Sequence, residues 1–254
     1  MNAIPLLQLE HVDKYFGQVQ ALTDVSLDVP AGQVTALAGD NGAGKSVLIK
    51  CIAGIHRPEQ GRILWQGSPV ELNSPRDAAS LGIETVYQDL ALCDNLDIVQ
   101  NMFLGRERRR GIRLDEDSME VSARDTLLGL GVTSVRSIRQ PVASLSVSQR
   151  QAVAIAKSVL WKSQLVIMDE PTAALGVTQT RVVLELIERL AAGGVAVIVI
   201  SHNMNDVFQV ADRIAVLYLG RLVAQLPASE MDRRMVVELM TQGRSERGMD
   251  QFAS

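Results

Sequence analysis

Residues 39 to 46 read Gly39-Asp40-Asn41-Gly42-Ala43-Gly44-Lys45-Ser46, which matches the pattern G-x-x-x-x-G-K-[S/T] at every fixed position. The pattern predicts a loop that holds the phosphates of a nucleoside triphosphate, because glycines let backbone N–H groups approach phosphate oxygens and permit positive φ. The ammonium of Lys45 would reach the β- and γ-phosphates, and the hydroxyl of Ser46 would hold Mg²⁺. Val47 opens the helix that follows, whose positive dipole end favours the same anion.

The residues on either side of this loop supply the structural context that the motif requires. Residues 34–38 are a short apolar run between two glycines, which predicts a buried strand. Residues 47–53 predict a helix that Gly54 closes. A glycine-rich turn that contains a lysine by chance is the alternative, and the strand–loop–helix order disfavours it. We therefore predict nucleotide binding at residues 39–47.

Length and composition limit the classes of protein that this chain can represent. Its 254 residues, 47% of them hydrophobic, suffice for one large domain or for a domain with a subdomain. The net charge of −4 gives no general attraction to nucleic acid, so we expect no nucleic-acid partner. No apolar run approaches the roughly 18 residues that span a bilayer, and the first residues lack the features of a signal peptide. Two cysteines form neither a disulfide framework nor a metal cluster, which indicates a reduced, cytoplasmic protein.

Hydrophobic periodicity predicts an α/β fold. Five strands are expected in the first third of the chain, at residues 7–12, 21–29, 34–38, 61–67 and 83–87, followed by a helical stretch at about 95–145. Helices at 148–161, 177–190, 204–210 and 229–240 then alternate with strands at 165–168, 195–200 and 213–218. This alternation predicts a largely parallel sheet with helices on both faces. Residues 242–254 are polar and are expected to fray.

Residues 106–113 form a basic stretch, Arg-Glu-Arg-Arg-Arg-Gly-Ile-Arg, within the expected helical region. Such a stretch could contact phosphate or lipid. Because acids follow at residues 115–117, a solvated helix end or loop is the favoured interpretation.

Two acids follow the apolar run at 165–168, which places them at the carboxyl edge of a buried strand, where α/β sheets bind ligands. Asp169 suits the Mg²⁺ shell, and Glu170 could polarise an attacking water. Apolar residues followed by Asp-Glu are a weak signal alone, but the phosphate loop makes the pair a strong one.

Two further polar residues end neighbouring strands. His202 follows the strand at 195–200, and although a lone histidine is more often structural, this position favours contact with the γ-phosphate and the water. Gln88 follows the strand at 83–87 and could reach both Mg²⁺ and the water, although a glutamine at a strand end means little alone.

Taken together, these motifs resemble those of the ATP-binding subunits of ABC transporters, over about residues 7–240. The phosphate loop matches as GDNGAGKS, the Q-loop as VYQD, the Walker B strand as LVIMDE, the D-loop as AALG and the His switch as ISHNM. The resemblance implies an α/β P-loop NTPase with a mostly parallel core, an N-terminal antiparallel subdomain and an inserted helical subdomain at about 92–162, all within one domain at 5–241. It also implies that Phe16 stacks on adenine, although in isolation Phe16 would be read as a core residue.

The stretches VYQDLALCDNLDIVQNMFLGRE, DEPTAALGV and ISHNMNDVFQVADRIAVLYLGR are similar to those of carbohydrate importers of the ribose, xylose and fructose type. That resemblance implies an enzyme that hydrolyses ATP to drive uptake of a monosaccharide. The implied partners are a second ATP-binding subunit, with a homodimer expected, a membrane permease and an extracytoplasmic sugar-binding protein. The implied location is the cytoplasmic face of the membrane.

The family's signature loop, normally LSGGQ, is Leu145-Ser146-Val147-Ser148-Gln149 in this chain. The resemblance implies that Ser146, Ser148 and Gln149 contact the nucleotide of a partner subunit across a head-to-tail dimer. Ser148 replaces a glycine, so its side chain could crowd the phosphate or resist a left-handed φ, at roughly 1–2 kcal/mol. Alternatively, Ser148 caps the following helix and donates its hydroxyl to the phosphate. We expect reduced, not abolished, ATPase activity.

Two other functions remain open from the sequence. A non-transport ABC ATPase of translation or DNA repair is one, although the paired cassettes, coiled coils and zinc clusters of such proteins are not seen. The second is a regulatory or heterodimer partner with low turnover, which the altered signature loop supports and the presence of Glu170 opposes.

Overall fold

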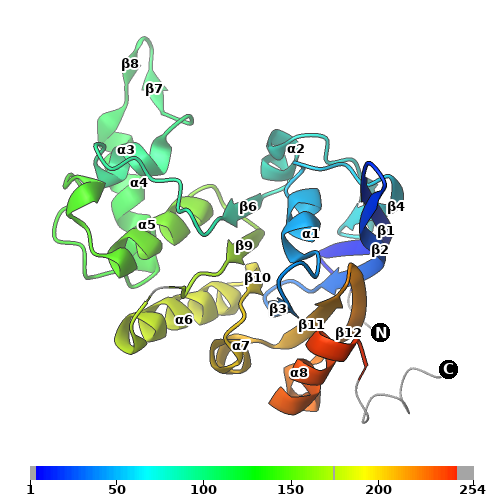
Figure 1. Cartoon of the computed structure of the whole chain (residues 1–254). Helices are drawn as coiled ribbons and strands as arrows, with labels where there is room; N and C mark the ends of the chain where they lie inside the picture. The colour runs from blue at the N-terminus through cyan, green and yellow to red at the C-terminus, as the bar shows by residue number, and fades with distance from the viewer. Residues whose placement is uncertain (1–3, 174, 245–254) are drawn as a thin grey trace.

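A computed structural model of the chain describes residues 4–173 and 175–244 (Figure 1). Predictions for residue 174 of the D-loop and for 245–254 of the polar tail lie outside the described residues. A six-stranded sheet has the order β12-β11-β3-β10-β9-β6, and a four-stranded sheet has the order β2-β1-β4-β5. The predicted α/β class is confirmed, with an antiparallel sheet at the N-terminal side and helices grouped beyond the end of the larger sheet.

The six-stranded sheet carries the edge at which the predicted site lies. Parallel pairing joins β11 to β3, β3 to β10, β10 to β9 and β9 to β6, whereas β12 is antiparallel to β11. All residues of β3 and β10 are buried, as expected for central strands covered on both faces. The strands are β3 (Val34–Gly39), β6 (Ile83–Val86), β9 (Leu165–Asp169), β10 (Ala196–Ile200), β11 (Arg213–Tyr218) and β12 (Arg221–Pro227).

The smaller sheet is antiparallel and packs over helix α1 (Lys45–Ile52). Its strands are β1 (Leu7–Phe16), β2 (Val19–Val29), β4 (Gln60–Trp65) and β5 (Ser68–Val70). Inward residues of this sheet share one core with α1 and with one face of the larger sheet, as Leu22, Leu48 and Ile198 illustrate. The helix that follows the phosphate loop is therefore held between two sheets (Figure 1).

A second core joins the other face of the larger sheet to the helical region. Phe103, Leu127 and Ile155 of that region belong to one cluster with Met168 and Val199 of the sheet. The helical region contains α3 (Ile98–Phe103), α4 (Glu116–Gly129), the 3₁₀ turn η1 (Val142–Ser144) and α5 (Val147–Val159). Elsewhere lie α2 (Pro75–Ser80), α6 (Val177–Ala192), α7 (Met204–Val210), η2 (Ala228–Glu230) and α8 (Arg233–Gln242). No helix in the described part of the chain is both long enough and apolar enough to span a bilayer.

Three sequence predictions of local structure are wrong in part. The stretch at 106–113 is exposed, as expected, and residues 106–108 are irregular, but the rest is not a loop because it forms a hairpin of β7 (Arg109–Arg110) and β8 (Arg113–Leu114). The stretch at 95–145 is therefore not helical throughout. The single helix expected at 229–240 is split, because Asp232 caps a separate helix by accepting the backbone N–H of Met235.

Besides the β7–β8 hairpin, helix α2 and strands β5 and β12 were not predicted. Helix α2 carries a recognisable start signal, since Ser74 caps it and Pro75 is its first residue. Strands β5 and β12 are edge strands that complete hairpins, and neither alternates cleanly enough to be recognised from its pattern.

Candidate nucleotide-binding site

The phosphate loop joins the end of β3 to the start of α1, as the motif predicts. Gly44 precedes α1 with φ of 104°, in the left-handed region. A Cβ at this position would lie 2.9 Å from the carbonyl oxygen of Ala21 and 3.1 Å from Leu22 Cδ2. Both the backbone conformation and the close approach of β2 therefore require glycine here.

Lys45 folds back over the loop. Its Nζ donates to the carbonyl oxygens of Gly39 at 2.6 Å and Asp40 at 2.9 Å. Burial lowers the pKa of the Lys45 ammonium, and nearby carboxylates, Glu170 foremost, oppose that shift. The ammonium is thus held at the mouth of the loop, where phosphate oxygens would replace the two carbonyls as acceptors.

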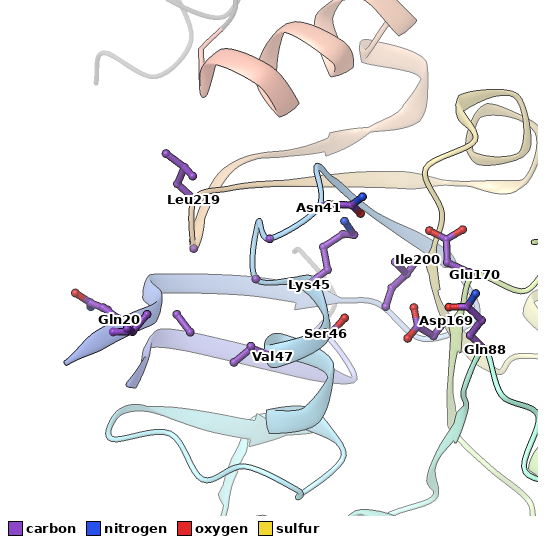
Figure 2. A pocket seen from close by; sticks show the side chains of 15 residues that line it. Gln20, Asn41, Lys45, Ser46, Val47, Gln88, Asp169, Glu170, Ile200 and Leu219 are labelled. Atoms are coloured by element: carbon purple, nitrogen blue, oxygen red, sulfur yellow. The ribbon is translucent and has the colours of Figure 1, made fainter. Parts of the chain in front are cut away.

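A cavity of about 580 Å³ opens beside the loop (Figure 2). Predicted site residues from three parts of the chain meet there: the loop and α1, Gln88 shortly after β6, and the end of β9. The lining residues are Val19, Gln20, Ala21, Asn41, Gly42, Gly44, Lys45, Ser46, Val47, Gln88, Asp169, Glu170, Ile200, Leu219 and Gly220. The fold therefore gathers phosphate donors, carboxylates and a glutamine in one place.

The two acids after the Walker B run differ in their surroundings. Asp169 ends β9, and burial raises the pKa of its carboxyl, with Glu170 raising it further and Lys45 opposing. Glu170 has φ of 50°, which is uncommon for a residue other than glycine and marks a strained position at a functional site. The backbone N–H of Glu170 donates to the carbonyl of Ile200 at 3.0 Å, which holds this strained turn against β10.

His202 is brought directly to Glu170. The distance from His202 Nδ1 to Glu170 Oε1 is 2.8 Å. The histidine side chain is 74% exposed and the glutamate side chain is 17% exposed, so the imidazole lies on the open side of the carboxylate. His202 does not itself line the cavity, and it meets the site through Glu170.

The donor set in the cavity fits a magnesium ion that is shared with a nucleotide. Among the described residues, no group of three or more His, Cys, Asp or Glu side chains could hold a metal unaided. Mg²⁺ is commonly held by one or two protein oxygens together with substrate phosphates and waters. Ser46, Gln88 and Asp169 line the same cavity as the phosphate loop and supply oxygens of that kind.

Phe16 does not line the cavity. The residue is 44% exposed, and its ring meets His56 edge-on, with 5.1 Å between the ring centroids. Lys14 Nζ lies 5.3 Å from the centre of the same ring. Adenine stacking by Phe16 therefore stays a prediction.

The altered signature loop begins α5, away from the cavity of its own chain. Ser146 is the N-cap: its Oγ accepts the N–H of Gln149 at 3.3 Å, and Gln149 Oε1 accepts the N–H of Ser146 at 2.9 Å. The expectation that Ser148 caps this helix is wrong, because Ser146 forms the capping box. Ser148 lies within α5 and its φ is not positive, so the left-handed strain considered for it does not arise. Its Oγ lies 3.2 Å from that of Ser146.

Six lining residues were not predicted from the sequence: Val19, Gln20, Ala21, Ile200, Leu219 and Gly220. Glycines at 17 and 220 signal two hairpin turns, but no local pattern tells which turns meet the phosphate loop. The meeting depends on long-range hydrogen bonds, from Thr23 N to Gly220 O at 2.8 Å and from Gly220 N to Ala43 O at 2.9 Å.

Known proteins share both the sequence and the fold. The chain is 45% identical over 93% of its length to the xylose/arabinose import ATP-binding protein of Sulfolobus acidocaldarius, of which 94% is covered. It is also 45% identical over 93% of its length to the fructose import ATP-binding protein of Rhizobium meliloti, with 94% of that protein covered. A ribose import ATP-binding protein of Yersinia pestis is 40% identical over 93% of this chain, which spans 47% of that longer protein.

Solved structures agree on the architecture. A component of the ABC transporter complex cbiONQ from Clostridium perfringens superposes with a TM-score of 0.78 at 26% identity, covering 94% of this chain and 96% of that one. The ADP conformation of an ATP-binding cassette of an ABC transporter gives a TM-score of 0.79 at 24% identity, covering 93% and 95%. The family model described as ABC transporter matches residues 22–173. The phosphate loop, the acids that end β9 and the shared architecture thus have one explanation: this chain belongs to the ABC transporter family.

Proposed function

We propose that this chain is the ATP-hydrolysing subunit of an ABC importer that takes up a monosaccharide through a separate membrane permease. The observation that carries the proposal is the cavity in which the phosphate loop meets Asp169 and Glu170, with His202 in contact with Glu170 from outside it. The names of the three relatives support sugar import. They also disfavour the alternatives in translation and DNA repair.

The residues at this site have distinct roles in the transfer of the γ-phosphoryl group to water. The loop amides and Lys45 bind the β- and γ-phosphates and offset the charge that develops there. Glu170 orients and polarises the attacking water, and His202 fixes the carboxylate through their 2.8 Å contact. Ser46, Gln88 and Asp169 would hold Mg²⁺, which would neutralise charge on the phosphate oxygens.

A second subunit completes each site in this proposal. The Ser146 loop does not line the cavity of its own chain. Two copies arranged head to tail would place each Ser146 loop on the nucleotide of the other, so that ATP clamps the subunits and hydrolysis releases them. Gln88 and the helical region after it would pass this motion to the permease. The subunit would then act at the cytoplasmic face of the membrane, beside an extracytoplasmic sugar-binding protein.

The direct test is Mg²⁺-dependent ATP hydrolysis by the purified chain, with Glu170→Gln as the variant. Loss of the carboxylate base should lower turnover by about 10²–10⁴-fold, and nucleotide binding should remain. Glu185→Gln on α6 is the matched control, because its side chain is 43% exposed, lies outside the cavity and pairs with Arg181 one turn earlier. Equal turnover in the two variants would contradict the role of Glu170.

A regulatory subunit with low turnover is the second candidate, and Ser148 is the observation that favours it. Its hydroxyl stands beside that of Ser146 on the first turn of α5, where a glycine would leave room for a phosphate. On this proposal, Ser148→Gly raises turnover. Unchanged turnover and unchanged ATP-driven dimerisation in Ser148→Gly would remove the support for a restrained motor.

A further inference from the structure

The hairpin formed by β7 and β8 projects from the helical region, away from both sheets (Figure 1). Its two-residue turn is Gly111-Ile112, and Gly111 has φ of 67°, which fits a tight hairpin turn with glycine first. The register pairs Arg109 with Leu114 and Arg110 with Arg113. The basic stretch is thereby folded into a narrow projection.

The arginines at the base of the projection are used within the protein. Arg106 forms an ion pair of 2.6 Å with Glu84. Arg108 donates to the hydroxyl of Ser122 at 2.7 Å and to the carbonyl of Ser118 at 3.1 Å, which ties the hairpin to α4.

The arginines nearer the tip face solvent. Arg109, Arg110 and Arg113 are all exposed, and none of their side chains forms a hydrogen bond or ion pair with any residue in the described ranges. The charge of Arg109 also acts on the carboxylate of Glu107. That carboxylate, however, accepts its hydrogen bond from the backbone N–H of Gly105, at 2.9 Å. These three cations therefore remain available to an external anion.

The acids that follow the hairpin are engaged elsewhere. Asp115 caps α4 by accepting the N–H of Ser118 at 3.3 Å, and Glu116 receives Arg139 at 3.2 Å. They do not balance the charge at the tip, although Asp117 stands exposed at the base.

Two features of the tip are unfavourable in water and would be stabilised by an external partner. Arg110 lies directly opposite Arg113, and like charges in that position destabilise a strand pair unless an anion lies between them. Ile112 at the turn is fully exposed, at 102%, and Leu114 is 51% exposed. The tip thus offers three unpaired cations around an apolar point.

We propose that this hairpin tip binds the anionic headgroups of a lipid bilayer, with the arginines on lipid phosphates and Ile112 at the boundary with the acyl chains. Basic side chains flanking an apolar one are the combination that a charged membrane surface recognises. The chain as a whole carries −4, so the attraction is local to the tip. A narrow projection presents a point to a flat surface and gives an acidic peptide no groove, which favours lipid. The inference rests on the proposed function, which places the helical region beside a membrane permease.

The test is partition of the purified full chain onto vesicles of phosphatidylcholine, alone or mixed with phosphatidylglycerol. Wild type should bind the anionic vesicles preferentially and lose that binding as salt rises. The triple variant Arg109→Gln, Arg110→Gln, Arg113→Gln should partition on the order of 100-fold less, because each cation near a charged surface contributes about fivefold. A matched control, Arg76→Gln, Arg221→Gln, Arg233→Gln, removes the same charge from exposed arginines elsewhere and should bind as wild type does.

Two substitutions test the contribution of the exposed Ile112 side chain. Ile112→Asp should weaken partition onto anionic vesicles, and Ile112→Leu should preserve it. Equal binding of wild type to neutral and anionic vesicles, or equal loss in the control triple variant, would overturn the proposal. Binding to soluble polyglutamate without binding to anionic vesicles would also overturn it, in favour of an acidic protein segment.

ATP hydrolysis in vesicle-free solution separates this inference from the proposed function. The tip variants lie outside the cavity and should hydrolyse ATP as wild type does. A chain without ATPase activity that still selects anionic vesicles through the three arginines would defeat the proposed function and retain the lipid site. An active ATPase that does not bind anionic vesicles would retain the proposed function and defeat the lipid site.

Discussion

At the scale of single residues, Gly44 shows how the phosphate loop depends on the strand beside it. Gly44→Ala places a Cβ 2.9 Å from Ala21 O at a φ of 104°, so we expect a loss of about 2 kcal/mol or more in the free energy of unfolding. Gly129→Ala is the matched control, because Gly129 lies in α4 with open space around it and should gain roughly 0.5–1 kcal/mol. Urea denaturation measures both. Equal effects would mean that the loop relaxes freely around a side chain.

Asp169 gives a prediction that depends on pH. Burial raises the pKa of its carboxyl above the ordinary 3.8, so the folded chain holds this proton more tightly than the unfolded chain. The free energy of unfolding therefore falls as pH rises through the interval between 3.8 and the higher folded pKa. Asp169→Asn lacks this loss and should be more stable than wild type at neutral pH, in chelator and without nucleotide. The advantage should vanish below pH 3.8.

The control for that experiment is Asp125→Asn, an exposed position on α4 that should change stability little at any pH. An Asp169→Asn chain that is less stable than wild type at neutral pH would contradict the assigned cause.

At the scale of secondary-structure elements, the start of α5 separates the two serines of the signature loop. Ser146→Ala removes the capping box and should cost about 1 kcal/mol in the free energy of unfolding. Ser148→Ala removes a hydroxyl that caps nothing and should change it by less than about 0.5 kcal/mol. Thermal and urea unfolding of the two variants check the contrast. A larger loss in Ser148→Ala would reverse the assignment of the cap.

Local signals explain which elements were predictable. The strand–loop–helix unit around Lys45 was predicted because glycines and an apolar run encode it within twenty consecutive residues. The β7–β8 hairpin was missed because its strands contain charged residues and no alternation, so that only Gly111 marks the turn.

The sequence predicted the phosphate and metal ligands of the cavity but not the residues that line its opposite side. Phosphate and metal ligands follow recognisable strand ends, and the larger sheet brings those ends together. Val19 begins β2 and Leu219 lies in the turn between β11 and β12, and the meeting of these segments with the loop is set by hydrogen bonds between distant parts of the chain, which no local pattern encodes. The roles of the residues within the cavity remain predictions that mutation must test.

At the scale of the whole molecule, the proposed head-to-tail dimer should depend on intact ATP. Glu170→Gln keeps the phosphate loop but slows hydrolysis, so ATP should hold its dimer together long enough for size-exclusion chromatography. Lys45→Ala is the counterpart that lacks the phosphate contact and should stay monomeric with ATP. A Glu170→Gln chain that remains monomeric at saturating ATP would oppose dimerisation of this chain with itself.

Because the Ser146 loop lies outside the cavity of its own chain, two different inactive mutants should complement each other. Two subunits that are each inactive should complement when Glu170→Gln lies in one and Ser146→Arg lies in the other. One of their two shared sites then receives an intact carboxylate and an intact loop. Placing both lesions in one subunit opposite a wild-type partner spoils both sites. Co-expression of differently tagged copies would therefore restore activity in trans and abolish it in cis.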